Sequence, residues 1–327
     1  MLFIACVGAP AGPVAGGAPG AGAPLLVVSD RGGAWRVYEV GADGASRLIG
    51  SPEISDTAYQ DGMPARLPDS RTVFVSDRDG APALYLAAPG SRAAARLFEA
   101  GSGGADSAPA PLGPDRVVFA RRDRGASSGS PRDLYSARLD GKDLRRLTSN
   151  PADEGAPSGS RDGRAVVFVS DRAGAPHLFL IADLTVSDPE AGAIDLSIAT
   201  SGGRRAERVG AAGESPATLS GPVDGGPILL EDQSIIFSRS SRGAPPQLFL
   251  MGRAGSGMAI RQVTDRSTLR YGAREPVLRE DGSILFVTGP APETGLHAVY
   301  EVTAGGFNLN RLSRDHARYS DFTRHLQ

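Results

Sequence analysis

Short apolar runs separated by turn residues recur along the chain from Leu25 onward. One large apolar residue stands at the centre of each run, and successive centres lie 45 to 69 residues apart. These residues are Val27, Phe74, Phe119, Phe168, Phe237 and Phe286. Runs of this length, rich in β-branched and aromatic residues and bounded by Gly, Pro and Asp, are typical of β-strands. The pattern therefore predicts a repeated unit of strands.

Two further columns of residues repeat in step with the first. The second column follows 11 to 16 residues later and is aromatic in all six units: Tyr38, Tyr85, Tyr135, Phe179, Phe249 and Tyr300. The third column is mostly a basic residue before an aliphatic one: Arg47-Leu48, Arg96-Leu97, Arg146-Leu147, Arg208-Val209, Gln262-Val263 and Arg311-Leu312. The three columns predict three successive strands in every unit, which we name B, C and D.

Five units also contain a Pro 10 or 11 residues before the first-column residue: Pro64, Pro109, Pro157, Pro227 and Pro276. An Asp lies between the Pro and that residue in each case: Asp69, Asp115, Asp162, Asp232 and Asp281. Because Asp favours tight turns, we expect a strand A that begins at the Pro and turns at the Asp into strand B. Four strands in about 47 residues is the size of one propeller blade.

Six such units predict an all-β fold, a six-bladed β-propeller with four-stranded antiparallel blades. The first unit lacks strand A, because Leu25 already begins its strand B. Residues 321–324 are in surplus at the end of the chain and are expected to supply the missing strand, which would remove open sheet edges. Residues 25–327 are accordingly expected to form a single propeller domain.

The first 24 residues differ from the rest, since residues 7–24 contain only Gly, Ala, Pro and Val. Residues 1–24 are therefore expected to form a tether. Residues 3–6, FIAC, resemble a bacterial lipobox in which Cys6 would receive lipid, although no basic segment precedes them. Two interpretations follow: a lipid-anchored envelope protein, with this segment as a signal remnant, or a plain disordered N-terminus.

Charge and composition narrow the classes of function. The 35 Lys and Arg residues nearly balance the 37 Asp and Glu residues, and a net charge of −2 provides no broad basic field for nucleic acid. No stretch approaches the roughly 20 apolar residues of a membrane helix, so membrane contact is expected only through a lipid anchor. The one Cys excludes an internal disulfide and a Cys-rich zinc site.

Two sequence features invite a catalytic interpretation, and both are weak. Residues 125–129, GASSG, match the G-x-S-x-G pattern, but its chemistry requires a strained strand-to-helix turn, whereas these residues lie in a turn between strands B and C. The His residues have no pair at metal-ligand spacing, and His177 and His297 are expected at the surface; the others are His316 and His325. We therefore expect no enzymatic activity, metal or cofactor.

Residues 160–172, SRDGRAVVFVSDR, followed by HLFL at residues 177–180, resemble the repeat of TolB-like six-bladed propellers, and RRLT at residues 145–148 resembles its end. The resemblance covers residues 25–327. It implies a binding scaffold in the periplasm or at the cell surface, in contact with an envelope protein or peptide, and a monomer is expected. TolB-like proteins carry a further N-terminal α/β domain, where this sequence has the tether. Related propellers include peptidase domains and metal-dependent lyases, so the alternative is a carbohydrate lyase or hydrolase at the channel mouth.

One further column is the candidate binding site. Three residues before the Pro that opens strand A, four of the five units carry an acid: Asp61, Asp106, Glu154 and Asp224; Ala273 is the exception. Strand A is the innermost strand of a blade, so these carboxylates are expected where D–A connections meet the central channel. Two interpretations stay open: turn caps at the start of strand A, or an acidic channel mouth that binds a cation or a basic segment of a partner.

Two further features of the sequence are a repeated Ser-Asp-Arg triplet and a long fourth unit. The Ser-Asp-Arg triplets that start at Ser29, Ser76 and Ser170 are expected to be structural, with the Asp capping a turn and the Arg pairing with it. The fourth unit is longer than the others between strands C and D, which predicts an insertion at residues 183–203. This insertion is expected on the face opposite the channel mouth, where long loops serve recognition.

Overall fold

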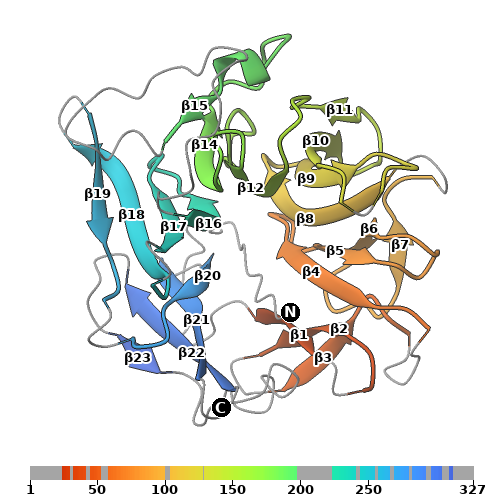
Figure 1. Ribbon diagram of the computed structural model, residues 1–327. Coiled ribbons are helices and arrows are strands. Elements are labelled where there is room, and N and C mark those ends of the chain that lie inside the picture. The colour runs from red at the N-terminus through yellow and green to blue at the C-terminus, as the bar shows by residue number, and fades with distance from the viewer. Residues whose placement is uncertain are drawn as a thin grey trace, which may run out of the picture. The chain divides into compact units, whose positions relative to one another are not determined.

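The computed structural model describes residues 24–29, 32–41, 45–52, 58–99, 104–127, 129–196, 223–240, 244–254, 257–265, 269–279, 282–291, 296–303 and 309–311. In these ranges the chain forms six antiparallel sheets and one short 3₁₀ helix, η1 (Glu190–Gly192) (Figure 1). The protein is a six-bladed β-propeller with three or four strands in each blade, as the repeat predicts.

The strands follow the order of the chain within every blade. Blade 1 comprises β1 (Leu25–Ser29), β2 (Arg36–Val40) and β3 (Ser46–Ile49). Blade 2 comprises β4 (Asp61–Arg66), β5 (Thr72–Ser76), β6 (Ala83–Ala87) and β7 (Ala94–Arg96). Blade 3 comprises β8 (Ala105–Leu112), β9 (Arg116–Arg122), β10 (Asp133–Arg138) and β11 (Arg145–Arg146).

The second half repeats this plan. Blade 4 comprises β12 (Glu154–Gly159), β13 (Val166–Ser170), β14 (His177–Ile181) and β15 (Ile194–Asp195). Blade 5 comprises β16 (Val223–Leu229), β17 (Ile235–Ser240), β18 (Gln247–Ala254) and β19 (Gly257–Gln262). Blade 6 comprises β20 (Arg274–Leu278), β21 (Ser283–Ala291), β22 (Leu296–Thr303) and β23 (Asn310–Arg311).

The predicted aromatic columns form the centre of each blade. All six first-column residues are fully buried, and each lies directly opposite the second-column residue of its own blade, as in the pairs Phe74↔Tyr85 and Phe168↔Phe179. In blades 2 to 6 the two rings lie 5.8 to 6.1 Å apart. Cross-strand aromatic pairs stabilise antiparallel sheets, which explains why both columns recur.

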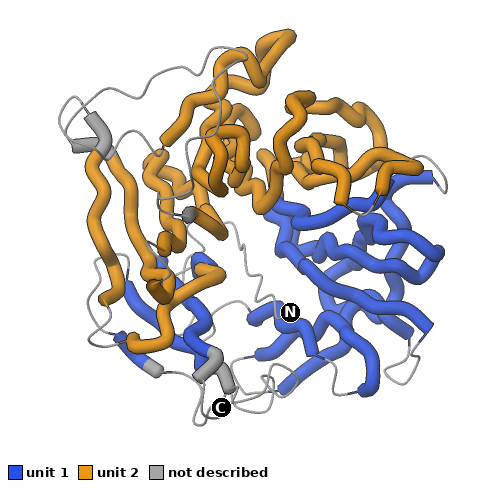
Figure 2. The backbone as a smooth tube through the Cα atoms, in the orientation of Figure 1, with its two compact units in different colours: residues 1–110, 277–327 blue, residues 111–276 orange. Residues whose placement is uncertain are grey.

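The chain divides into two compact units, residues 1–110 with 277–327, and residues 111–276 (Figure 2). In the first unit one apolar cluster joins Leu26 and Val28 of β1 to Leu285 and Val287 of β21, so blades 1 and 6 pack together. In the second unit a cluster that includes Val167 and Phe237 joins blades 4 and 5. Burial of apolar faces between neighbouring blades is thus the main stabilising term in each unit.

Strand A begins two to four residues before the Pro, earlier than the sequence predicts. The register shifts at the Pro in β4, β12 and β16, because Pro has no N–H to give to the ladder and is accommodated at a β-bulge. The residue before each Pro has a positive φ: Met63 (48°), Ala108 (47°), Ala156 (45°), Gly226 (53°) and Glu275 (51°).

The prediction for strand D of blade 4 is wrong. This strand is β15, in which Asp195 lies opposite Phe179, whereas residues 208–209 lie outside the described residues. Asp195 occupies the position that an arginine holds in blades 2, 3 and 6, so the basic signal is missing there. Among the described residues blade 1 has three strands and no strand A. Its proposed fourth strand, residues 321–324, also lies outside the described residues, as does the tether up to residue 23.

Candidate functional site

The four acids of the candidate site lie at the start of strand A, inside the strand and not in the preceding loop. Their exposed fractions do not exceed 3%. The backbone N–H of each donates to a carbonyl just before strand C of the preceding blade; the acceptors for Asp61, Asp106, Glu154 and Asp224 are Trp35, Pro82, Arg132 and Pro176, at 2.9 to 3.1 Å. Ala273 makes the same bond to Pro246 at 2.7 Å. The column therefore marks a repeated backbone contact between blades.

Arginines of the same blade neutralise three of these carboxylates. Arg78 donates to Asp61 at 2.8 Å, and Arg239 donates to both oxygens of Asp224, at 2.5 and 2.8 Å. Arg172 pairs with Glu154 in the same way. Each of these carboxylate side chains is fully buried, so the arginine supplies the charge that the interior requires.

The same arginines cover the aromatic pair of their blade. The guanidinium carbon of Arg78 lies 4.6 Å from the ring centre of Tyr85, and that of Arg172 lies 4.9 Å from that of Phe179. Arg239 lies 5.0 Å from Phe237. Acid, arginine and aromatic residue thus form one packed unit, which we call the acid–arginine–aromatic unit. Cation–π contact adds to the ion pair within it.

The Ser-Asp-Arg triplets belong to this unit. Arg78 Nε donates to Ser76 Oγ at 2.9 Å, and Asp77 accepts the backbone N–H of Gln60 at 2.6 Å. The triplet Asp is therefore a cap, as expected, but the triplet Arg pairs with the acid of strand A and not with that Asp. Of the first triplet the structure describes only Ser29.

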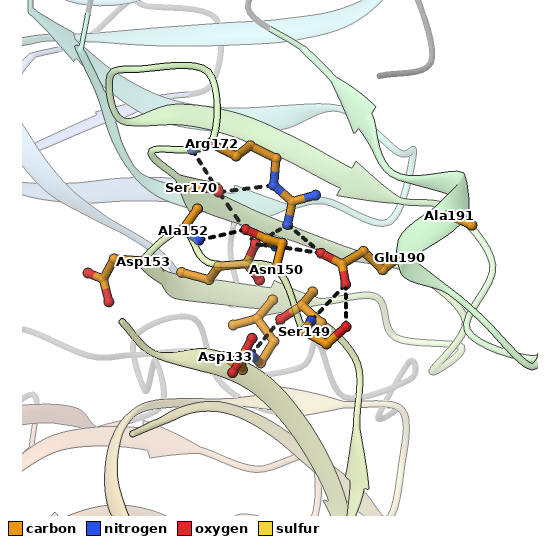
Figure 3. A network of polar contacts seen from close by, with 12 residues as sticks. Asp133, Ser149, Asn150, Ala152, Asp153, Ser170, Arg172, Glu190 and Ala191 are labelled. Atoms are coloured by element: carbon orange, nitrogen blue, oxygen red, sulfur yellow. Dashed lines mark hydrogen bonds and ion pairs between the residues drawn. The ribbon is translucent and has the colours of Figure 1, made fainter. Parts of the chain in front are cut away.

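Blade 4 adds a second carboxylate to its unit (Figure 3). Glu190 of η1 lies 3.1 Å from Arg172 and accepts the backbone N–H of Ser149 at 2.7 Å. Asn150 donates to both Glu190 and Glu154, the latter at 2.7 Å. Burial raises the pKa of Glu154, and the charge of Arg172 offsets only part of this effect.

The start of the predicted insertion is fastened to blade 3. Arg145 of β11 donates to the carbonyl of Leu184 at 2.6 Å and to those of Val186 and Ser187. Together with Glu190, these bonds tie residues 184–190 to the neighbouring blade. This part of the insertion therefore serves as a clamp between blades 3 and 4, and residues 197–203 lie outside the described residues.

His177 is buried, with 8% exposed, and the expectation of a surface position is wrong. Its Nδ1 lies 3.8 Å from Oδ2 of Asp224 in the next blade. Burial opposes ionisation of Asp224, but hydrogen bonding to Arg239 and the positive charge of Arg239 outweigh burial and lower the pKa of Asp224. Strand position alone could not reveal this contact, because it joins two blades.

The other candidate residues stay apart. Ser127 lies in the loop between β9 and β10, with Oγ 3.0 Å from Ser130 Oγ, and no helix follows it there. The side chain of His297 lies outside the described residues, as do Cys6, Ser128, His316 and His325. Within the described ranges, no group of three or more His, Cys, Asp or Glu residues is placed to hold a metal ion. No helix in those ranges is long and apolar enough to span a membrane.

Comparison with known proteins supports the predicted resemblance. A TolB homolog of Chlorobium luteolum is 30% identical over 163 residues, which cover 49% of this chain and 34% of the relative. The crystal structure of TolB from Acinetobacter baumannii matches 91% of this chain and 65% of its own length, with a TM-score of 0.60 and 16% identity. The chain is similar to TolB. It spans about a third of the curated relative's length, and no protein-family model matches it.

Enzymes share this propeller. An oligogalacturonate lyase in complex with manganese matches 89% of this chain and 73% of its own length, with a TM-score of 0.55 and 13% identity. At such low identity the likeness shows the fold alone, and the same holds for the A. baumannii TolB structure. The comparisons therefore do not separate a binding scaffold from a propeller enzyme.

Proposed function

We propose that this chain is a non-catalytic binding scaffold of the bacterial cell envelope. The observation that carries the proposal is the sequence similarity to a TolB homolog over 163 residues, and the likeness of the fold to the A. baumannii TolB structure supports it. We place the protein in the periplasm or at the cell surface, with Cys6 as the candidate lipidation site. Its partner is an envelope protein or peptide.

The proposed docking surface is, within each unit, the end of the blades where strands A begin. The acids there, Asp61, Asp106, Glu154 and Asp224, are buried, so we assign them to packing within the propeller and not to direct contact with a partner. A basic segment of the partner or a cation would meet the more exposed acids beside them. Asp77 and Asp171, the middle residues of two Ser-Asp-Arg triplets, are two of these acids. Each follows a buried Ser, and Asp171 is exposed.

A pull-down with the full chain tests this surface. The tagged wild type should retain an envelope protein, and salt should weaken the retention because exposed charges are screened over about 8 Å at physiological ionic strength. The double variant Asp77→Asn, Asp171→Asn should retain less. Asp140→Asn, in the exposed turn between β10 and β11 at the opposite end of a blade, is the matched control. Equal retention of the envelope protein by the double variant and by the Asp140→Asn control would contradict the docking surface.

Two further measurements test the class of function and the location. Incubation with oligogalacturonate and manganese should yield no unsaturated product, whereas turnover would establish the enzyme alternative.

In the native bacterium, a tagged full-length protein should partition into detergent and Cys6→Ser should abolish this. A fully soluble wild type with an intact N-terminus would contradict lipidation.

A further inference from the structure

Blade 6 departs from the acidic column and carries its carboxylate two residues later. Ala273 stands at the column position and makes the same backbone bond between blades as the four acids. Glu275 follows at the bulge of β20, directly before Pro276. The equivalent bulge residues of the other blades are uncharged: Met63, Ala108, Ala156 and Gly226.

One oxygen of the Glu275 carboxylate lacks a hydrogen-bond donor among the described residues. Its Oε2 atom is buried and accepts no hydrogen bond from the described residues, in contrast to the arginine-paired Asp61 and Asp224. The neighbouring Arg274 also has a buried Nε atom without an acceptor, so the two side chains do not satisfy each other through these atoms. A buried carboxylate oxygen without a donor costs free energy.

The backbone at Glu275 is also unfavourable. Its φ of +51° lies in the left-handed region that disfavours residues with a Cβ. The adjacent bulge of blade 5 packs against it: a Cβ added at Gly226 would lie 3.3 Å from Pro276 Cδ and 3.8 Å from Glu275 Cα. Alanine occupies the same conformation in blades 3 and 4, so the fold does not require a glutamate here. Backbone strain together with a buried carboxylate oxygen that lacks a donor is typical of a functional position.

We propose that Glu275 binds the ammonium or guanidinium group of a lysine or arginine side chain presented by a partner. Such a cation supplies a hydrogen-bond donor for the Oε2 atom and a positive charge beside the carboxylate. A divalent metal is disfavoured because it needs several protein ligands, and the described residues place no such group together. The residue as a whole is half-buried, so part of its side chain is accessible to solvent, and a ligand would approach the buried Oε2 atom from that part. This inference rests on the proposed binding function and names the chemistry of its partner.

The test uses the full chain and small probes. N-acetyl-lysine amide and N-acetyl-arginine amide should bind at pH 8 with millimolar affinity, measured by calorimetry and by the ¹³C shift of the Glu275 carboxyl. N-acetyl-norleucine amide, which has the four side-chain carbons of lysine without the ammonium group, should not bind. Glu275→Gln and Glu275→Ala should weaken binding at least about tenfold. Glu231→Gln, an exposed glutamate paired with Arg161, should leave it unchanged.

Three outcomes would overturn the assignment: equal binding of the norleucine amide, undiminished binding by both Glu275 variants, or no binding of either cationic amide. The Ala variant guards against misfolding, since two other blades carry alanine at this bulge. If the probes fail while an envelope protein is still retained in the pull-down, the scaffold function stands and this site falls. If the probes bind but no envelope protein is retained, the scaffold function falls and the cation site stands.

Discussion

At the scale of single residues, the arginine at the end of strand B, or two residues after it, makes two contacts at once. It neutralises a buried carboxylate at the start of strand A, and its flat guanidinium covers the aromatic pair of strands B and C. A lysine could supply the charge but not the planar stacking or a two-pronged bond such as that between Arg239 and Asp224. Arg78 and Arg172 make the same two contacts, which explains why the Ser-Asp-Arg triplets of blades 2 and 4 end in arginine.

Substitution of Asp224 by Asn should destabilise the protein strongly. The variant leaves the Arg239 guanidinium buried, 10% exposed, without its counter-charge. Removal of one partner from a buried pair costs about 3 to 5 kcal/mol in the free energy of unfolding, which urea denaturation would measure. Glu231→Gln breaks an ion pair in which both side chains are at least half exposed, and it should change stability by less than about 1 kcal/mol. A small loss at Asp224 would contradict the packed unit.

Glu275 provides a pH test at the same scale. Burial raises its pKa from 4.5 to about 7 and Arg274 opposes the shift, so the folded state holds this proton more tightly than the unfolded chain does. Relative to Glu275→Gln, the wild type should therefore lose stability as the pH rises from about 4.5 through 7, by roughly 1 to 3 kcal/mol in total. Melting of both proteins at pH 5 and pH 8 measures this difference. An identical offset at both values would contradict it.

At the scale of elements, strand A is the unusual strand of each blade. It carries a Pro in its middle, and the residue before that Pro has a positive φ in all five cases. At each described bulge the register shifts, and two residues of strand A, such as Met63 and Pro64, do not pair with strand B. Strands B and C run regularly past each other, so the bulge confines the irregularity to one strand and leaves the aromatic pairs in register.

Glycine at one of these bulges should be tolerated or even favourable. Ala156→Gly removes the Cβ that makes the left-handed conformation unfavourable. This gain offsets the greater backbone entropy that glycine loses on folding, which costs about 0.5 to 1 kcal/mol. The free energy of unfolding should then stay constant or rise. Ala137→Gly, the same change at a buried position of the regular strand β10, should lower it by about 1 kcal/mol. Equal losses in the two variants would argue against strain at the bulge.

At the scale of the whole molecule, the repeat made most of the fold predictable from the sequence. Phe74 and Tyr85 or Phe168 and Phe179 are large, buried and in fixed register, so each leaves a clear periodic signal. The candidate site was harder to predict. The burial of Asp61 and its pairing with Arg78 depend on a backbone bond from another blade, which one unit's sequence does not contain. The clamp at Glu190 joins two blades in the same way.

Closure of the propeller provides the last prediction. The first sheet has only β1, β2 and β3 among the described residues, so the edge of β1 lacks the strand A that the other blades possess. We expect residues 321–324 to fill this position, although they lie outside the described residues. Deletion of residues 319–327 would then expose an unpaired strand edge and weaken the packing of blade 1 against blade 6, in which Leu26 and Leu285 share one cluster.

The deletion should lower the melting temperature by several degrees or cause aggregation, because an edge strand with unpaired backbone groups is a template for association. Calorimetry of the full chain and of the deletion variant measures the first effect, and light scattering measures the second. Replacement of residues 319–327 by a Gly/Ser segment of equal length controls for chain length and should behave like the deletion. A deletion variant that melts like the full chain would show that blade 1 is held by its apolar contacts with blades 2 and 6 alone, and would rule out closure by this segment.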